Sequence, residues 1–296
     1  MKFDSEQIAD IVDIWNSQLS ADPTNLTQLK NKYFENPYVD IFCPILKNKS
    51  FSLICKKSKK FLYEPFREDT AWIFAMAIGN RNDLDDLLDL QIGTARSNGI
   101  KRIIFSNFSP GYFYPGIDHE TYPEIYKYLL NRGFRESEEA LAMDANIGEL
   151  RISRRPVKGV DIKNLNENEK DELLILIEKY FPADCYKRAN DVIMSGGYEQ
   201  ITIAKLDGKI VGYSMFSSGE GKYTYAEGER FGCFEVIESV RSSGIGSLLL
   251  EKTLLNMKSN FIRNAYFLWT GEKASHLYSR YGFRVFRKFK IMTLEI

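Results

Sequence analysis

The residues best suited to chemistry are Arg241-Ser242-Ser243-Gly244-Ile245-Gly246, where an apolar run gives way to a helical pattern. A glycine-containing turn from a strand into a helix leaves several backbone N–H groups unpaired and pointing outward together. The helix dipole adds partial positive charge there, so such a turn can hold an anion such as a pyrophosphate. Arg241 would add a charge-assisted contact. Glycines at a helix start also serve turn geometry alone, so the stretch by itself is compatible with either role.

A second candidate is Tyr278, in the helical segment expected over 273–281. The apolar and aromatic residues of this segment follow the spacing i, i+3, i+4, i+7 and share one helix face: Ala274, Leu277, Tyr278 and Tyr281. Tyr278 is then either a core aromatic or a phenol that can donate a proton as a general acid.

Candidate general bases lie on or beside the strand expected over 223–237, which carries Glu227, Glu229, Glu235 and Glu238. The first three have the same strand parity, so they face one side of the sheet if the strand is unbroken. Each is equally compatible with a solvated edge carboxylate, and a relayed water can replace a dedicated base. Glu235 is our candidate for the base.

These residues need a framework, and the second half of the chain predicts one. Two alternating runs within 201–216 are joined by Asp207-Gly208, a strong hairpin signal. Further strands are expected at 160–165, 223–237, 264–269 and 284–295, and helical periodicity covers 165–195, 245–258 and 273–281. Strands first and helix–strand alternation later indicate an α/β domain with a mixed sheet.

The first half of the chain repeats this outline. The segment 97–108, SNGIKRIIFSNF, precedes a helical pattern that ends in RGF, and 259–270, SNFIRNAYFLWT, precedes one that ends in YGF. A charged stretch with a proline and a glycine at 151–159 is typical of a linker. With 296 residues the chain is long enough for two domains, which we expect at 1–150 and 151–296.

The pattern Arg241-x-x-Gly244-x-Gly246, an apolar helix, a strand, and then Ala274-x-x-x-Tyr278-x-x-x-Gly282-Phe283 resembles the GCN5-related N-acetyltransferase (GNAT) superfamily. The resemblance is specific over roughly 160–296 and extends to the first half as a degenerate copy. It implies two tandem acyl-CoA N-acyltransferase (GNAT) folds of the α/β class with a mixed sheet.

The same resemblance implies roles for individual residues. In the family the loop holds the pyrophosphate of acetyl-CoA, and the pantetheine arm follows the fourth strand. Contacts to acetyl-CoA are thereby implied for Phe234, Val236, Glu238, Arg241, Ser242, Ser243, Gly244, Ile245, Gly246 and Ser247. Tyr278 matches the tyrosine that protonates the departing CoA thiolate. The family often has Asn at the place of Gly271 and Pro at that of Glu238, so one side-chain contact to the coenzyme is missing here.

The first half lacks the residues that carry the resemblance. Gly79–Leu84 stands opposite the loop but without its glycine pair, and three aspartates crowd the expected helix start: Asp83, Asp85 and Asp86. Carboxylates there would stabilise the helix and repel a diphosphate. Leu129 stands opposite Tyr278. We expect a domain that keeps the fold and does not bind the coenzyme. Its long aromatic loop at 106–123 either covers the sheet or forms one wall of the acceptor pocket.

Composition excludes several classes of protein. Lys plus Arg and Asp plus Glu are balanced at 40 each, which leaves no electrostatic footprint for general nucleic-acid binding. Four scattered cysteines without a CxxC pair argue against a zinc site and fit a reducing cytosol. No apolar run approaches the roughly 18 residues of a membrane span, and the N-terminus does not look like a signal peptide. We expect a cytoplasmic protein that uses no metal and binds neither nucleic acid nor membrane.

We therefore predict an N-acetyltransferase whose C-terminal domain transfers the acetyl group of acetyl-CoA to an amine by direct attack in a ternary complex. Cys233 lies on the expected fourth strand without a nearby His in sequence, so a covalent route is the lesser option. The alternative is a non-catalytic acyl-CoA-binding sensor or scaffold, which would need the loop but not Tyr278. The acceptor can be a small molecule or a peptide, because acceptor pockets in this fold come from variable loops.

Overall fold

The computed structural model describes residues 3–58, 68–109, 111–150, 156–217 and 228–296. It divides into two compact units: unit 1 comprises Met1–Leu141 and Arg287–Ile296, and unit 2 comprises Ala142–Phe286. Two strands cross this division, β6 (Arg135–Asn146) and β12 (Arg284–Glu295). The last ten residues therefore belong to unit 1, whereas the boundary expected at 150/151 placed them in the second domain.

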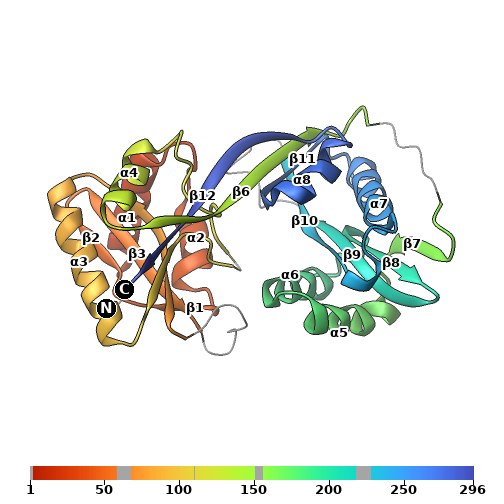
Figure 1. Ribbon diagram of the computed structural model, residues 1–296, viewed down its shortest axis with the longest axis horizontal. Coiled ribbons are helices and arrows are strands. Elements are labelled where there is room, and N and C mark those ends of the chain that lie inside the picture. Colours follow the sequence, from red (N-terminus) through yellow and green to blue (C-terminus); the bar gives the residue numbers. More distant parts are fainter. Residues whose placement is uncertain (1–2, 59–67, 110, 151–155, 218–227) are drawn as a thin grey trace. The chain divides into compact units, whose positions relative to one another are not determined.

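Unit 1 is a mixed sheet with helices packed on it (Figure 1). Its remaining elements are α1 (Ser5–Gln18), α2 (Leu26–Leu29), the π-helical turn η1 (Lys30–Phe34), β1 (Val39–Ile41), β2 (Ile45–Lys47), β3 (Ser50–Lys57), β4 (Thr70–Ala77), α3 (Arg81–Ser97), β5 (Arg102–Phe105) and α4 (Pro123–Asn131). The strand order is β1-β3-β4-β5-β12-β6, with β2 paired to β3. Strands β4 and β5 are parallel, and β5 pairs antiparallel with β12.

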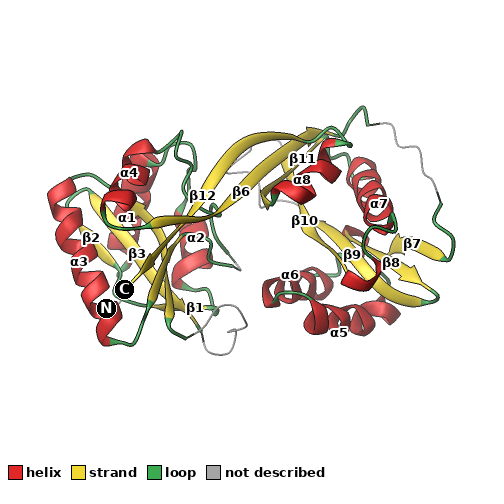
Figure 2. Ribbon diagram, in the orientation of Figure 1, coloured by secondary structure: helices red, strands yellow, loops and turns green. Residues whose placement is uncertain are grey.

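Unit 2 is a second mixed sheet with helices on both faces (Figure 2). Its elements are β7 (Val160–Asn164), η3 (Glu167–Glu169), α5 (Lys170–Tyr180), α6 (Ala183–Met194), η4 (Tyr198–Gln200), β8 (Ile201–Leu206), β9 (Lys209–Ser217), β10 (Gly228–Val236), η5 (Glu238–Val240), α7 (Ile245–Ser259), β11 (Asn264–Thr270) and α8 (Glu272–Ser279). The strand order is β11-β10-β9-β8-β7, and the end of β6 lies next to β11.

The two faces of the unit 2 sheet have separate cores because strand side chains alternate. Tyr213 and Met215 of β9 pack with Leu173 and Ile177 of α5. Phe216, the next residue along β9, packs on the other face in a core shared by α7 and α8. A side chain on one face of the sheet therefore has different neighbours from a side chain on the other face.

Most strands and helices expected for the second half are confirmed. The hairpin at Asp207-Gly208 joins β8 to β9, with Leu206 paired to Lys209 and both turn residues at positive φ. The helix expected over 245–258 is α7, and the strand expected over 284–295 is β12. The helical pattern over 165–195 is divided into α5 and α6, because Pro182 stands between them and cannot continue a helix. Residues 223–227 of the expected fourth strand lie outside the described residues.

Candidate functional site

The candidate site in unit 2 begins where β10 and β11 part. Their parallel register joins Gly228–Arg230 to Asn264–Tyr266, and both strands then continue without further pairing to each other within the described residues. Beyond Arg230, the backbone N–H and C=O groups of β10 that point toward β11 are therefore not part of the β10–β11 ladder. An unpaired strand edge of this kind can hydrogen-bond an extended ligand.

Phe234 and Val236 direct their backbone groups to that edge. The Ile237 N–H donates to the Val211 carbonyl of β9 at 2.9 Å. Because backbone direction alternates along a strand, Glu235 also points its backbone toward β9, and the residues on either side of it point toward β11. Gly212 of β9, which pairs with Val236, permits the close approach of the two strands, since a Cβ on Gly212 would lie 2.8 Å from the Glu235 carbonyl oxygen.

The loop that follows β10 is folded by its own contacts. The Arg241 Nε donates to the Val236 carbonyl at 3.0 Å, and the Ser243 hydroxyl donates to the Val240 carbonyl at 2.7 Å. Ser242 has φ +65° and Gly244 has φ +91°, both in the left-handed region. Gly244 is the N-cap residue of α7, and no side chain caps the helix there. The first-turn amides of α7 are consequently not used by a capping side chain.

The loop, strand β10 and helix α8 meet at Gly246. A Cβ on Gly246 would lie 3.4 Å from the Phe234 ring and 3.9 Å from a methyl carbon of Leu277. The Phe234 ring in turn lies 5.9 Å from the Tyr278 ring, centroid to centroid. The structure thus brings the glycine loop, the β10 edge and Tyr278 together.

Helix α7 is also bonded to the turn that follows α8. The Tyr281 hydroxyl donates to the Glu251 carboxylate of α7 at 2.8 Å. Glu251 is only 7% exposed. Ser247 is the third residue of α7, so its backbone N–H belongs to the first turn of the helix.

Tyr278 is buried in an aromatic cluster. Its ring lies 4.6 Å from Phe267, 5.8 Å from Phe283 and 5.9 Å from Phe231. Burial raises the pKa of the Tyr278 hydroxyl, and the Glu235 carboxylate raises it further. The phenol therefore stays protonated at neutral pH, in the form that can donate a proton.

Glu235 lies on the other face of the sheet. It stands directly opposite Tyr213 in the β10–β9 pair, so the two side chains share the face covered by α5 and α6. Burial raises the pKa of the Glu235 carboxyl to about 7; Arg241 lowers it and Asp184 at the start of α6 raises it. A carboxyl with this pKa is half ionised near neutrality, as a general base requires.

The other candidate bases differ from Glu235. Glu227 lies outside the described residues, the Glu229 side chain is not described, and Glu238 is exposed on η5. The expected common face depended on an unbroken strand, and that condition is not met. The β10–β9 register shifts between Phe231 and Phe234, which inserts one residue and reverses the alternation.

Asp184 was missed by sequence reasoning. It belongs to the first turn of α6, far from Glu235 along the chain, yet it interacts electrostatically with Glu235. An acidic residue in the first turn of a helix is common because it complements the helix dipole, so nothing in the sequence marks Asp184 as part of a site.

In unit 1 the corresponding helix start is occupied by protein groups. Helix α3 follows β4 as α7 follows β10, and its N-cap Asn80 accepts a hydrogen bond from the Asn82 N–H through its side chain. The Ser50 hydroxyl accepts from the N–H groups of Gly79 and Asn80 at 3.0 and 3.1 Å. A Cβ on Gly79 would lie 2.1 Å from the Lys49 carbonyl oxygen. Protein groups therefore surround the backbone that precedes α3.

The aromatic loop at 106–123 is part of the unit 1 core. Phe108, Phe113 and Tyr114 are buried, and the first two pack on Phe74 of β4 with centroid distances of 5.7 and 5.8 Å. Tyr122 is buried as well and donates to the Asp22 carboxylate at 2.7 Å. These contacts favour the interpretation of the loop as a cover over the sheet.

Arg287 connects that loop to the rest of unit 1. Its guanidinium donates to Asp22 at 2.6 and 2.9 Å and to Asp118 at 2.7 Å. All three side chains are nearly buried, with exposed fractions of 11%, 4% and 5%. Arg287 belongs to β12, so the last strand holds the loop and the α1–α2 connection together by charge.

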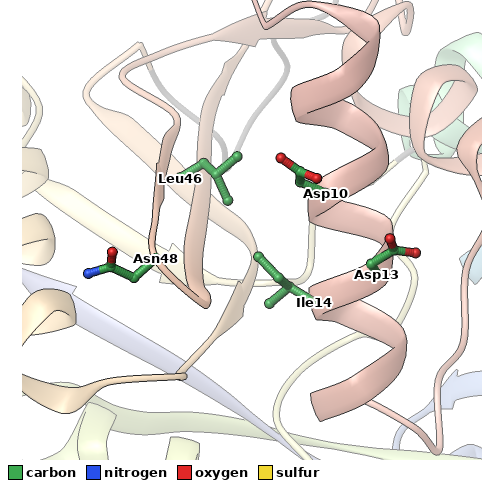
Figure 3. A pocket seen from close by; sticks show the side chains of 5 residues that line it. All are labelled: Asp10, Asp13, Ile14, Leu46 and Asn48. Carbon is green, nitrogen blue, oxygen red and sulfur yellow. The ribbon is translucent and has the colours of Figure 1, made fainter.

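Unit 1 also contains a pocket. It is lined by Asp10, Asp13 and Ile14 of α1, Leu46 of β2, and Asn48 (Figure 3). Among the residues that the structure describes, no group of three or more His, Cys, Asp and Glu side chains is placed to hold a metal ion. None of the helices in the described ranges has the length and apolar character needed to cross a membrane.

Comparison with known proteins found a family model that matches part of unit 2. Residues 197–285, which contain the loop, β10 and Tyr278, match the family model described as Acetyltransferase (GNAT) domain. This confirms the resemblance seen in the sequence. No curated protein sequence matches the chain.

Three solved structures share the fold over 99% of this chain. A GCN5-related glucosamine N-acetyltransferase region of a fungal multi-domain GH3 β-N-acetylglucosaminidase is 13% identical with a TM-score of 0.76, and this chain covers 37% of its length. A GCN5-related N-acetyltransferase from Sphaerobacter thermophilus is 12% identical with a TM-score of 0.70, and 94% of it is covered. A tandem GNAT protein from the clavulanic acid biosynthesis pathway is 13% identical with a TM-score of 0.65, and 95% of it is covered. The fold is that of two tandem GNAT domains, as predicted.

Proposed function

We propose that this tandem GNAT protein is an N-acetyltransferase in which unit 2 binds acetyl-CoA and transfers its acetyl group to an amine. The observation that carries the proposal is the uncapped start of α7 beside the unpaired edge of β10. The first offers amides and a helix dipole to a pyrophosphate, and the second offers backbone partners to a pantetheine arm. The GNAT family match over 197–285 supports the same assignment.

Each part of the loop has a role in this proposal. The amides of Ile245, Gly246 and Ser247 hold the pyrophosphate, and Gly244 sets the turn that presents them. Ser242 and Ser243 lie on the exposed loop, where their N–H groups can join the same contact. Arg241 adds positive charge, while its Nε bond to Val236 fixes the loop against β10. Phe234 and Val236 supply the strand edge for the pantetheine arm. Glu238 lies just beyond this edge, at the beginning of η5.

Glu235 serves as the base in the proposed reaction. An amine must lose a proton before its lone pair can attack the thioester carbonyl carbon, and a carboxylate with pKa about 7 can accept that proton at neutral pH. Asp184 places a second negative charge nearby, which favours a positively charged acceptor on this face of the sheet. The acceptor class is therefore an amine that arrives as an ammonium ion.

Tyr278 serves as the acid. Attack by the neutral amine nitrogen forms a C–N bond and breaks the C–S bond of the thioester, which leaves a thiolate and a nitrogen that releases its second proton to solvent. Tyr278 donates its hydroxyl proton to the sulfur and afterwards recovers a proton from solvent. The aromatic surroundings of Tyr278 disfavour both a bare thiolate and a phenolate. Burial therefore penalises the negative charge both before and after the proton transfer, and does not by itself oppose the transfer.

Unit 1 has no coenzyme in this proposal. The start of α3 is capped by Asn80, and Ser50 already accepts from the preceding amides, so few free donors remain for a diphosphate. We therefore expect one acetyl-CoA per chain. Two equivalent binding events in calorimetry would contradict this part of the proposal.

The central test measures binding and turnover separately. Isothermal titration calorimetry with acetyl-CoA should show binding, and release of the CoA thiol should follow when a suitable amine from a panel is added. Tyr278→Phe should bind acetyl-CoA as the parent does but release thiol about 10- to 100-fold more slowly. Tyr281→Phe is the matched control, because it also removes one tyrosine hydroxyl, in this case one that bonds Glu251. Binding without turnover on any amine would favour the acyl-CoA sensor, and no binding would refute both assignments.

A further inference from the structure

The bulge just before Glu235 determines which face of the sheet this side chain occupies. The β10–β9 register shifts between Phe231 and Phe234. Between these two residues β10 has two residues, 232–233, where β9 has only Met215. Side chains alternate along a strand, so without the extra residue Glu235 would share the face of Phe231. With the extra residue, Glu235 lies on the face covered by α5 and α6.

Arg188 of α6 bonds directly to this bulge. Its Nη2 donates to the Gly232 carbonyl at 2.9 Å, and the bond is partly buried. In a bulge two residues face one on the partner strand, so the ladder is locally disrupted. Arg188 supplies a charged donor to a carbonyl of the bulge, and such hydrogen bonds are stronger than those between neutral groups. The bond therefore favours the bulged strand over a regular one.

Gly232 permits the bulge through its backbone conformation. Its φ is +117°, a value that residues with a side chain rarely adopt. Apart from its chain neighbours, no heavy atom lies within 4 Å of a Cβ built on Gly232, so conformation and not space requires the glycine here. The bulge thus depends on Gly232 for its geometry and has Arg188 as a side-chain partner.

Helix α6 brings two charged side chains to this part of β10. Asp184 and Arg188 are four residues apart and therefore lie on one face of the helix. Asp184 and, from the loop after β10, Arg241 act on Glu235 by charge. Arg188 reaches the strand through a backbone carbonyl three residues before Glu235, so its effect on Glu235 passes through the position of β10.

We propose that Arg188 is a positioning residue for Glu235: by holding the Gly232 carbonyl it keeps the bulge in place and the carboxyl on the face covered by α5 and α6. Its importance for catalysis rests on the proposed function, in which Glu235 is the base. Without the bond the strand before Glu235 loosens, and water reaches the carboxyl. The opposite face disfavours a carboxylate, because it holds the aromatic core that contains Phe231 and Tyr278.

The first test follows the Glu235 carboxyl directly and needs no turnover. Its titration is read by NMR on protein with ¹³C-labelled glutamate, and Glu235→Gln assigns the signal. Burial raises the pKa of this carboxyl to about 7 in the parent. In Arg188→Met the midpoint should fall by at least about one pH unit, because water then solvates the carboxylate. Loss of a nearby cation alone would raise the midpoint, so the sign separates displacement from loss of charge.

Two further variants of α6 serve as controls. Lys187→Met is the matched control, because it removes the neighbouring positive charge, which pairs with Asp191 on the same helix; it should leave the midpoint unchanged. Arg188→Lys keeps a charged donor on a different side chain and should restore part of the shift. Circular dichroism and urea unfolding establish that each variant is folded. A folded Arg188→Met with an unchanged or raised midpoint would overturn the proposal.

Gly232→Ala tests the bulge from the strand side and also serves if Arg188→Met does not fold. Alanine has room at this position but disfavours φ +117°, so the midpoint should fall as in Arg188→Met. The double variant should shift the midpoint no further than the larger single change, because both substitutions act through the bulge. Shifts that add in full would show two independent effects and would count against the proposed route.

The last measurement concerns acetyl transfer. Arg188→Met should lower kcat about tenfold, and acetyl-CoA binding in calorimetry should stay within about threefold of the parent. Added to Glu235→Gln, it should cause no further loss, because no base is then left to position. Parental kcat in an Arg188→Met protein with a lowered midpoint would overturn the catalytic importance of Arg188. A lowered midpoint together with a fully active Glu235→Gln would instead refute the base of the proposed function and leave the positioning of the carboxyl intact.

Discussion

Glu235 and Tyr278 interact electrostatically, although their side chains belong to different faces of the unit 2 sheet. Burial raises the pKa of Tyr278, and the carboxylate of Glu235 raises it further. Glu235 stands opposite Tyr213 on the face covered by α5 and α6, while Tyr278 lies in the core beneath α7 and α8. When Glu235 takes a proton, its charge disappears and Tyr278 becomes a stronger acid. Proton uptake from the amine would thereby favour proton donation to the leaving thiolate.

This coupling predicts that Glu235→Gln lowers the pKa of Tyr278. The substitution removes the negative charge but not the burial, so the pKa should fall and still stay above its ordinary value near 10. The measurement is the titration of ring-labelled tyrosine by NMR, with Tyr278→Phe to assign the signal. Glu238→Gln, on exposed η5, is the matched control. An unchanged titration in Glu235→Gln would show that the two groups act independently.

The raised pKa of Glu235 predicts opposite effects on activity and stability. Activity requires the carboxylate, so kcat/KM of the parent should rise with pH through about 7. Glu235→Gln should have a kcat/KM about 100-fold lower than that of the parent and should not show this rise. The folded protein holds the Glu235 proton to a higher pH than the unfolded chain, whose pKa is near 4.5. Stability is therefore lost as pH rises from about 4.5 to about 7, by up to about 3 kcal/mol.

Urea unfolding at two pH values checks this sign. Glu235→Gln should be more stable than the parent at pH 8 and nearly equal to it at pH 4, where Glu235 is neutral in both states. A variant that loses activity and also loses stability at pH 8 would indicate a structural role for Glu235 instead of a base.

The loop predicts different outcomes for two changes at Gly244. Both Gly244→Ala and Gly244→Asp place a side chain at φ +91°, which costs on the order of 1–2 kcal/mol. Only aspartate adds a negative charge where the pyrophosphate is proposed to bind. In calorimetry with acetyl-CoA we expect alanine to weaken binding less than about tenfold and aspartate more than about 100-fold. Circular dichroism confirms the fold of each, and equal losses would remove the loop from the binding site.

We expect the ion pairs of Arg287 to stabilise unit 1. Replacing it with Met leaves the buried carboxylates of Asp22 and Asp118 without their cation, at a cost of about 3–5 kcal/mol. Burial alone would raise the pKa of Asp118, but hydrogen bonds from Thr121 and Arg287 lower it. The stability from a lowered carboxyl pKa is present above its unfolded value and is lost as pH falls.

The deficit of Arg287→Met in denaturant unfolding should therefore be largest at neutral pH and shrink in acid. Adding Asp22→Asn and Asp118→Asn to Arg287→Met should restore part of the stability at neutral pH, because no buried charge is then left unpaired. A triple variant as unstable as the single one at every pH would assign the loss to packing instead of charge.

The sequence predicted the local features of unit 2 because they depend on neighbouring residues. Asp207-Gly208 specifies a hairpin, and Gly244 specifies a left-handed residue at a helix start, wherever they occur. The contacts that tune the site could not be predicted in this way. Glu235 owes its pKa to burial and to Asp184, which belongs to a helix far away along the chain. The bulge between Phe231 and Phe234 also left no pattern, although it decides which face Glu235 occupies.

The crossing of β12 into unit 1 has a consequence for synthesis of the chain. In the unit 1 sheet β12 lies between β5 and β6, so those two strands lack their common neighbour until the last ten residues have been translated. Unit 2 is continuous in the chain and is complete earlier, although it comes second in sequence. Because domains fold as units while a chain emerges from the ribosome, the order of folding should be the reverse of the order of translation. A nascent chain stalled before residue 287 would expose β5 and β6 as edges open to aggregation.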